Sequence, residues 1–288
     1  MTSSPSSWWA NKTVWVTGAS SGIGEGVAYD LHLRGARLVL SARREEELNR
    51  VRDRCIRNGG QQGGSSSGLF DPVVLPLDLN DLDSLPTKAR EAAHKLGGRH
   101  VQVIVHSGGR GMRAAASDTS ASVEHELMNV NYFAAVELTR AVLPDMIRHR
   151  EGTIVVISSV QGRVPLPDRS SYSASKHALH GYFNSLRMEV KSKGVQVTMV
   201  LPGYVATNLS NAAATADGSL YGKTDSTTAK GYTPAHVAER ISKGVAKGRR
   251  EIWIMQLKGR FAIWMQVLAP AVLEWALSRG IGHSRASS

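Results

Sequence analysis

Short apolar runs alternate with longer amphipathic segments along most of this chain. Seven runs rich in aliphatic and β-branched residues predict strands, at 13–17, 37–42, 73–79, 101–107, 153–159, 196–202 and 251–255. Most of these runs are apolar on both faces, which is typical of parallel strands that are covered by helices on both sides. The pattern therefore predicts a doubly wound α/β fold around a seven-stranded parallel sheet, in a single domain.

The segments between these strands carry apolar residues at steps of three and four positions, which predicts helices at 22–34, 45–58, 82–96, 123–148, 172–193 and 234–247. We expect residues 11–256 to form the domain, after a flexible N-terminus of residues 1–10. Residues 59–68 are rich in glycine, serine and glutamine and contain no apolar side chain that could pack. We therefore expect this insertion to be mobile.

Length and charge narrow the class of protein. The 288 residues suit one packed α/β domain, and 35 basic against 24 acidic side chains give a net charge of +11. This excess indicates an anionic partner such as a phospholipid surface or a phosphorylated cofactor, although it also promotes solubility alone. The chain shows no zinc-ligand spacing and no basic run interleaved with aromatics, so we expect neither a metal site nor a nucleic acid partner. A single cysteine, Cys55, fits a reducing intracellular compartment.

A glycine-rich turn follows the first predicted strand and opens the first predicted helix. Glycines allow the tight turn and let backbone N–H groups at the helix N-terminus approach a pyrophosphate. Any strand-to-helix turn can need glycine for its backbone angles, but the position in the first strand–helix unit favours a dinucleotide and a Rossmann-type fold. The candidate binding residues are Gly18, Ser20, Ser21, Gly22, Ile23 and Gly24.

The end of the second predicted strand indicates which dinucleotide is bound. A carboxylate that holds the ribose 2′-hydroxyl of NAD is expected about 20 residues after the glycine turn. The chain has Arg43 and Arg44 there instead, and guanidinium groups suit a phosphate. We therefore expect NADP(H), with the alternative that both arginines only begin the second helix. Asp78, at the end of the third predicted strand, is a candidate for the adenine amino group or, equally, for the cap of a turn.

Tyr172 and Lys176 are four residues apart and so share one face of the fifth predicted helix, and Ser159 ends the strand before it. An ammonium group beside a phenol favours the phenolate, which would lower the pKa of Tyr172 from about 10. Such a pair on its own is more often a surface contact. Together with Ser159 and the glycine turn, it indicates an acid or base for carbonyl chemistry.

The order of these motifs resembles that of the short-chain dehydrogenase/reductase family, over about residues 12–254. The resemblance implies that Tyr172 donates a proton to a substrate carbonyl oxygen during reduction, and that Ser159 hydrogen-bonds the same oxygen. It also implies that Lys176 holds the nicotinamide ribose and that Asn131 holds a water that links this lysine to solvent. The residues that would border the nicotinamide carboxamide are Pro202, Gly203 and Thr207.

One turn departs from the family pattern. After the fourth strand the family usually shows Asn-Asn-Ala-Gly, whereas this chain reads His106-Ser107-Gly108-Gly109. Gly109 is retained and Ser107 can supply one hydrogen bond, so both are candidate cofactor contacts. We expect His106 to be structural, because a lone histidine at a strand end is more often held by hydrogen bonds than catalytic.

Residues 202–229 are similar to the member 7B group of this family, which implies a membrane-associated NADPH-dependent reductase that acts on acyl- or alkyl-dihydroxyacetone phosphate. We expect the loop at 208–232 to cover the substrate, because so long a connection in a compact domain is usually a lid or a binding element. Candidate partners for a substrate phosphate are Arg110, Arg113 and Arg163.

Residues 257–288 form an amphipathic tail, with a basic segment before an aromatic-rich apolar face. Such a face rests on anionic lipid, or it packs against its own domain or a second subunit. The longest apolar stretch, at 261–277, is interrupted by polar residues and proline, and it is short of the ~20 apolar residues that span a bilayer. With no signal peptide evident, we expect a cytoplasmic protein or one peripheral to the endoplasmic reticulum or peroxisome. The resemblance implies a homodimer or homotetramer.

The sequence thus favours an NADPH-dependent oxidoreductase that reduces the ketone of a lipid-like substrate. An NAD(P)-linked hydroxysteroid or retinoid dehydrogenase would use the same four catalytic residues and is the alternative. A non-enzymatic interpretation, a nucleotide-sensing scaffold, is supported only by the altered turn at His106 and Ser107.

Overall fold

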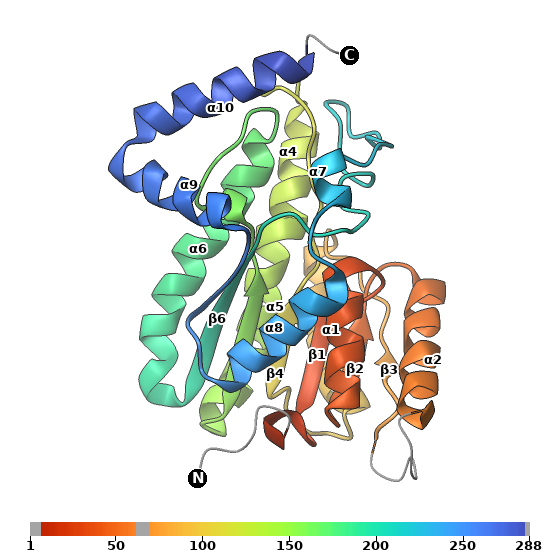
Figure 1. Ribbon diagram of the computed structural model, residues 1–288. Helices are drawn as coiled ribbons and strands as arrows, with labels where there is room; N and C mark the ends of the chain where they lie inside the picture. The colour runs from red at the N-terminus through yellow and green to blue at the C-terminus, as the bar shows by residue number, and fades with distance from the viewer. Residues whose placement is uncertain (1–6, 62–68, 286–288) are drawn as a thin grey trace.

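Seven parallel strands form the centre of the molecule, in the order β3-β2-β1-β4-β5-β6-β7 (Figure 1). The computed structural model describes residues 7–61 and 69–285. The strands are β1 (Thr13–Thr17), β2 (Arg37–Ser41), β3 (Val73–Val74), β4 (Val103–His106), β5 (Gly152–Ile157), β6 (Val195–Pro202) and β7 (Glu251–Ile254). The predicted fold, a single α/β domain around a seven-stranded parallel sheet, is confirmed.

Helices cover both faces of this sheet. They are α1 (Gly22–Leu33), α2 (Glu45–Gln61), α3 (Leu85–Lys95), α4 (Ala121–Met128), α5 (Ala134–Arg148), α6 (Ser170–Val190), α7 (Ser226–Ala229), α8 (Pro234–Ala246), α9 (Leu257–Leu268) and α10 (Pro270–Arg285), with short turns η1 (Ser7–Trp9), η2 (Leu82–Ser84), η3 (Asn129–Phe133), η4 (Val160–Gly162) and η5 (Lys191–Lys193). Trp15 and Val39 point into the core shared with α3, α5 and α6, whereas Val14 and Leu38 point into the core shared with α1, α2 and α8. Both strand faces are apolar because each meets a helical layer.

β3 contains two residues, whereas the sequence predicts a strand over 73–79. The chain still follows β2 beyond this point, since the N–H groups of Leu75 and Leu77 donate to carbonyls of β2 and the residue after it at 3.0 Å. Pro76, between them, has no N–H group, and β3 is the edge strand. The regular ladder therefore ends early, although the direction of the chain is as predicted.

The long helix predicted over 123–148 consists of two helices joined by a π-helical turn. α4 ends at Met128, α5 begins at Ala134, and the turn η3 between them holds the buried Asn131. π-Helical turns inside α-helices occur mostly at functional sites. The three- and four-residue apolar pattern continues on both sides of the turn, which is why the sequence predicts a single helix.

The packed core includes residues before Asn11. Trp9, in η1, is fully buried, and its Nε1 donates to the carbonyl of Ser242 in α8 at 3.2 Å. The expectation of a flexible N-terminus is therefore wrong for residues 7–10, because burial of the indole holds this segment against α8. Residues 1–6 lie outside the described residues.

The predicted insertion at 59–68 is partly helical, since residues 59–61 continue α2, and the remainder lies outside the described residues.

The two helices of the tail, α9 and α10, follow β7 and lie at one end of the molecule, beyond α6 (Figure 1). Pro270 begins α10 and does not kink a single helix, because proline fits the first turn, where no N–H donor is needed. Across the described residues, we find no helix that combines the length and the apolar character that a bilayer-spanning segment needs.

His106 connects the sheet to a helical layer. It ends β4, is buried, and its Nε2 is 2.9 Å from the hydroxyl of Thr139 in α5. Burial lowers the pKa of His106 to about 3. The imidazole is therefore neutral near neutral pH and acts as a structural bridge, as the sequence leads us to expect.

We expect the His106→Asn variant to lose less stability in acid than the native protein. Folding depresses the pKa of His106 from 6.5 to about 3, so its stabilising contribution is fully present above the unfolded value and falls as the pH drops below it. Between about pH 7 and about pH 5 the native protein should lose about 2 kcal/mol more than the variant, whose amide can still hydrogen-bond Thr139. Urea unfolding followed by circular dichroism measures this difference. Equal losses in both proteins would contradict the assignment, and the exposed His125→Asn serves as the control.

Candidate active site

The carboxyl ends of the central strands border a cavity of about 610 Å³. It opens where the strand order reverses between β1 and β4, which is where ligands bind in open α/β sheets. Of the predicted site residues, its wall contains Gly18, Ser20, Ser21, Gly22, Ile23, Arg43, Arg44, Asp78, Ser107, Gly109, Ser159, Tyr172, Lys176, Pro202, Gly203 and Thr207. Gly24 and Asn131 are not part of the wall and support residues that are.

Three glycines shape the turn between β1 and α1. Gly18 and Gly22 have φ angles of +67° and +59°, which glycine adopts without strain. A Cβ on Gly18 would lie 2.6 Å from the backbone nitrogen of Gly108, and one on Gly24 would lie 2.2 Å from the Gly18 carbonyl oxygen. Ser21, the N-cap of α1, makes no side-chain capping hydrogen bond. The amino end of α1 therefore presents its N–H groups and positive dipole to the cavity, which fits a pyrophosphate.

The two arginines after β2 lie at the wall of the same cavity. Arg43 and Arg44 are both exposed, and Nη2 of Arg44 is 3.5 Å from the hydroxyl of Ser20 in the glycine turn. This contact brings a guanidinium group beside the turn that suits a pyrophosphate. The residues at the end of β2 thus offer positive charge where an NAD-specific site would offer a carboxylate.

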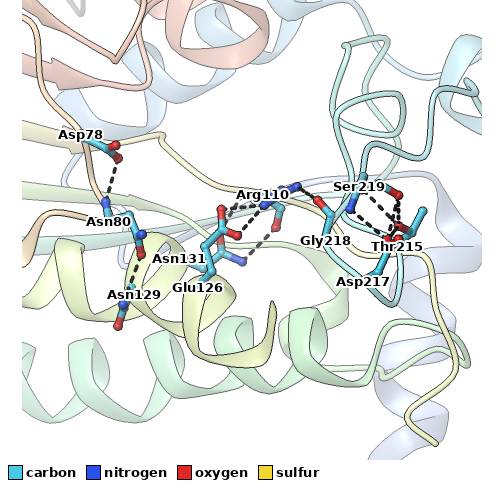
Figure 2. A network of polar contacts seen from close by, with 10 residues as sticks. All are labelled: Asp78, Asn80, Arg110, Glu126, Asn129, Asn131, Thr215, Asp217, Gly218 and Ser219. Atoms are coloured by element: carbon cyan, nitrogen blue, oxygen red, sulfur yellow. Dashed lines mark hydrogen bonds and ion pairs between the residues drawn. The ribbon is translucent and has the colours of Figure 1, made fainter. Parts of the chain in front are cut away.

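Asp78 caps a turn, and its proposed contact with an adenine amino group stays a prediction. One of its carboxylate oxygens accepts a hydrogen bond from the N–H of Asn80 at 2.9 Å, so it caps the turn after the third strand (Figure 2). The amide oxygen of Asn80 in turn accepts from Asn129 in η3 at 3.2 Å (Figure 2). Asp78 nevertheless remains exposed in the cavity wall, where its other oxygen can accept a hydrogen bond.

Ser159, Tyr172 and Lys176 come together at the wall of the cavity. Tyr172 and Lys176 are one turn apart on α6, and the ammonium Nζ lies 5.7 Å from the centre of the phenol ring. The same Nζ donates to the carbonyl of Ile157 at the end of β5, at 3.1 Å. Ser159 accepts from the N–H of Gln161 at 3.1 Å, which orients its hydroxyl.

Burial controls the ionisation of Tyr172 and Lys176. It raises the pKa of Tyr172, although a hydrogen bond with Ser159 and the positive charges of Arg113 and Arg169 pull the pKa down. Burial also lowers the pKa of Lys176 to about 8. The expectation that Lys176 gives Tyr172 a lowered pKa is therefore wrong for the protein alone, because removing the phenolate from water outweighs the neighbouring charges.

Asn131 braces the backbone beside the lysine. Its Oδ1 accepts from the N–H of Arg110 at 2.7 Å, and its Nδ2 donates to the carbonyl of Arg110 at 3.0 Å (Figure 2). The same Nδ2 also donates to the hydroxyl of Ser175 at 3.0 Å. A Cβ on Gly109 would lie 3.1 Å from this Oδ1 and 3.5 Å from Lys176 Nζ. A side chain at position 109 would therefore crowd the amide of Asn131, whereas its contact with Lys176 would be an ordinary one. The predicted role of Asn131 in holding a water stays a prediction.

The candidate arginines differ in their surroundings. Arg110 and Arg113 line the cavity, and they pair with Glu126 and Asp225 respectively. Arg163 pairs with Glu251 across to β7 and is not part of the cavity wall. Its candidacy for a substrate phosphate is therefore wrong.

The sequence analysis missed Arg169 and Asp225. Arg169 is the N-cap residue of α6, three positions before Tyr172, and its guanidinium lies 3.6 Å from the carboxylate of Asp225. In the sequence, the three-residue spacing from Tyr172 is the only feature that points to Arg169. Asp225 could not be placed from sequence, because it comes from the long loop. Among residues 7–61 and 69–285, no three His, Cys, Asp or Glu side chains gather in a group that could hold a metal ion.

Comparisons with known proteins agree with this geometry. A family model described as short chain dehydrogenase matches residues 12–218. A Dehydrogenase/reductase SDR family protein 7-like of Anopheles gambiae is 41% identical over 268 residues, which are 93% of this chain and 82% of that protein. Dehydrogenase/reductase SDR family member 7B of Xenopus tropicalis is 40% identical over 257 residues, 89% of this chain and 81% of that protein.

Solved structures show the same fold. A short-chain dehydrogenase from Streptomyces avermitilis has a TM-score of 0.75 at 26% identity, covering 96% of this chain and 98% of that one. A metagenomic short-chain oxidoreductase in complex with NADP has a TM-score of 0.69 at 26% identity, covering 86% and 98%. The resemblance inferred from the motifs, including that to the member 7B group, is confirmed. The chain therefore belongs to the short-chain dehydrogenase/reductase family of NAD(P)-dependent oxidoreductases.

Proposed function

We propose that the protein uses NADPH to reduce the ketone of a lipid-like substrate to an alcohol. The observation that carries this proposal is the composition of one cavity wall, which contains Ser159, Tyr172 and Lys176 together with Arg43 and Arg44. The first three supply the groups for protonating a carbonyl oxygen, and the two arginines suit a 2′-phosphate. The open amino end of α1 between them suits a pyrophosphate.

The chain's own residues handle the carbonyl oxygen and its proton. When bound, the reduced nicotinamide supplies a hydride to the substrate carbonyl carbon. Ser159 donates a hydrogen bond to the carbonyl oxygen, and Tyr172 donates its phenolic proton to the same atom. Because burial raises the pKa of Tyr172, this hydroxyl still carries its proton near neutral pH. Pro202, Gly203 and Thr207, which line the same cavity, would border the nicotinamide carboxamide.

Lys176 stabilises the phenolate that remains after proton transfer. Its pKa of about 8 leaves it mostly charged near neutral pH, and an ammonium group near the ring favours the phenolate. The positive charges of Arg113 and Arg169 act in the same direction. Lys176 would also hold the nicotinamide ribose, and Asn131 would hold the water that links this lysine to solvent.

Replacing Tyr172 with phenylalanine should remove most of the activity. The variant keeps the ring but lacks the proton donor, so kcat/KM for ketone reduction should fall by about 10² to 10⁴-fold while NADPH still binds. The assay follows the loss of NADPH absorbance with a panel of lipid-like ketones, and NADPH binding is titrated by fluorescence. Tyr182→Phe, a half-buried tyrosine on the same helix, is the matched control and should retain its activity. A Tyr172→Phe enzyme as fast as the native one would refute the assigned role.

The preference for NADPH over NADH rests on the end of β2. Both arginines there are exposed at the cavity, and residues 41–44 include no carboxylate that could bind the ribose 2′-hydroxyl of NAD. The NADP complex of the metagenomic relative adds support, since that chain has the same overall fold.

The double variant Arg43→Ala, Arg44→Ala should lose this preference. Because both arginines are exposed and solvent screens them, their two contacts to a phosphate together contribute about 1.4–2.8 kcal/mol, so the Kd for NADPH should rise by about 10 to 100-fold. The Kd for NADH, which lacks the phosphate, should change less than about threefold. Calorimetric titration of both cofactors measures the difference, with Arg140→Ala, an exposed arginine of α5, as the control. Equal weakening of both cofactors would contradict the proposal.

The proposed substrate combines an apolar chain with an anionic group. Apolar side chains of the wall suit the chain, and they are Val160, Leu166, Leu209, Ala212 and Leu220. Arg113 in the same wall is paired with Asp225, and its guanidinium also donates to Ser210 and to the carbonyl of Met112, so it is no free cation. The apolar lining and the similarity to the member 7B group therefore support acyl- or alkyl-dihydroxyacetone phosphate. A hydroxysteroid or retinoid would use the same catalytic residues.

The altered turn after β4 gives little support to the alternative that the protein is a nucleotide-sensing scaffold. The altered turn at His106 and Ser107 keeps its place, because Gly108 packs directly on Gly18 and Ser107 stays in the cavity wall. Family membership and the intact Ser159, Tyr172 and Lys176 favour turnover.

The tail supports contact with a membrane surface. Its exposed large apolar side chains are Leu257, Phe261, Trp264, Val267, Leu268, Val272 and Trp275, and Leu257 is 82% exposed. Among the described side chains of α9 and α10, only Ile263 and Leu273 are buried, and Ala262, Met265 and Leu277 pack partly against the same core. Packing against the chain's own domain therefore does not account for the exposed side chains of this face. Lys258 and Arg260 are exposed beside it. An apolar face with aromatics and basic neighbours suits anionic lipid, and we infer a peripheral location on the reticulum or peroxisome.

The triple variant Phe261→Ser, Trp264→Ser, Leu268→Ser should weaken sedimentation with vesicles of phosphatidylcholine and phosphatidylserine by about 10-fold or more, because it removes much of the apolar area. Met188→Ser, which removes an exposed apolar side chain from α6, is the control and should bind as the native protein does. Light scattering measures the mass in solution and so tests the alternative that the apolar face of the tail binds a second copy of the chain. Unchanged vesicle binding, or a halved mass in the variant, would refute the lipid assignment.

We propose that the homodimer or homotetramer forms separately, through α5 and α6.

A further inference from the structure

The segment directly after Gly109 links the catalytic side chains to the long loop. Gly109 itself lies against Asn131 and Lys176. The next residue, Arg110, has its backbone N–H and carbonyl both held by the side-chain amide of Asn131, at 2.7 and 3.0 Å (Figure 2). Asn131 is buried, so the backbone position of Arg110 is fixed relative to the catalytic groups.

The side chain of Arg110 reaches the loop. Its Nη1 donates to both carboxylate oxygens of Glu126 in α4 at 2.6 Å, and its Nη2 donates to the carbonyl of Gly218 at 2.6 Å (Figure 2). The ion pair is partly buried, with side-chain exposures of 17% for Arg110 and 29% for Glu126. It is therefore less screened by solvent than a surface pair.

Residues 215–219 form the tip of the long loop, and hydrogen bonds within this tip orient the carbonyl of Gly218. Asp217 accepts hydrogen bonds from the Thr215 hydroxyl and from the N–H and hydroxyl of Ser219, at 2.7 to 3.0 Å (Figure 2). These bonds lower the pKa of Asp217 to about 2. Gly218 adopts a φ of +91°, and a Cβ there would lie 3.2 Å from Val123 in α4. The turn is thus locally well bonded, and its attachment to the domain includes the bond to Arg110.

The position of the tip matters for the cavity. The loop pairs with the segment after Arg110, because the N–H of Ala214 donates to Gly111 at 2.9 Å and the N–H of Arg113 donates to Ala214 at 2.8 Å. The residues on either side of this pairing form part of the cavity wall, namely Leu209, Ala212 and Leu220. A shift of the tip therefore moves an apolar part of the wall.

We propose that Arg110 is a positioning residue that fixes the substrate loop relative to the catalytic residues. Its backbone is set by Asn131, and its guanidinium, neutralised by Glu126, holds the carbonyl of Gly218. The apolar wall formed by the loop is thereby kept at a constant distance from Tyr172 and Ser159. The effect on the loop is independent of the reaction, whereas the effect on catalysis rests on the proposed reductase function.

This assignment excludes Arg110 as a partner for a substrate phosphate. Both Nη atoms are already engaged, one with a carboxylate and one with a carbonyl. The arrangement needs the planar fork of arginine, because one group must meet two acceptors in different directions. A lysine can satisfy one of them at a time.

Proteolysis tests the effect on the loop without any substrate. Lys223 and Lys230 are exposed trypsin sites within the loop. In Arg110→Gln, cleavage at these two lysines should be about 10-fold faster than in the native protein, because the local opening of the loop costs less. Mass spectrometry identifies the cut positions. Arg110→Lys should give an intermediate rate.

Two further variants separate the proposed role from simple loss of structure. Asp217→Asn loosens the exposed turn from the other side of the same contact and should also accelerate cleavage. Arg140→Gln removes an exposed ion pair with Glu137 on α5, and it should change neither cleavage nor stability. If Arg110→Gln fails to fold, Asp217→Asn and Arg110→Lys still decide whether the contact holds the loop.

Kinetics test the effect on the site. With a ketone that the native enzyme reduces, Arg110→Gln should raise KM by about 10-fold, leave kcat and its pH dependence nearly unchanged, and keep the Kd for NADPH within about twofold. Arg110→Lys should restore part of the KM. Unchanged cleavage overturns the proposal, as does faster cleavage with an unchanged KM. If the native protein reduces no ketone, the proposed function fails, and the cleavage rates still decide whether Arg110 holds the loop.

Discussion

The contact between Gly18 and Gly108 is the constraint on which the site depends. It brings the turn after β1 against the turn after β4 at the carboxyl edge of the sheet, with no room for a Cβ on Gly18. The crevice between these turns is where the residues proposed to bind the nucleotide meet those proposed to act on the substrate. A Cβ on Gly108 would lie 2.2 Å from Leu79, so the side chain of Leu79 fills the space that the family's usual alanine would need. The altered turn is therefore compensated locally and keeps the crevice in place.

Burial then sets the chemistry of the side chains around this crevice. It favours the neutral form of both Tyr172 and Lys176, which raises the pKa of the phenol and lowers that of the amine. A protonated phenol suits reduction, in which the tyrosine gives up its proton. Two arginines oppose the shift of the phenol, and both lie beside Asp225 of the long loop. The loop thus contacts the two arginines that lower the pKa of Tyr172, and it also shapes the cavity.

Local patterns in the sequence predicted most of the fold and the central part of the site. The sheet, the glycine turn and the Tyr172–Lys176 pair depend on periodicity or on spacings of a few residues. The errors have a common cause, which is packing between distant segments. Trp9 is buried by α8, Asn131 lies in a π-helical turn, and the edge strand β3 ends before Pro76. None of these features changes the local apolar pattern that the prediction uses.

The sequence by itself determined the fold class, the family and the identity of the groups that can carry out carbonyl chemistry, because those depend on residue type and short-range order. The tertiary structure decided which charges are available. Arg163 is taken up by Glu251, 88 positions away, and Arg110 by the carbonyl of Gly218, 108 positions away. It also decided the direction of the pKa shift of Tyr172, since desolvation and the field of distant charges depend on how the chain is packed.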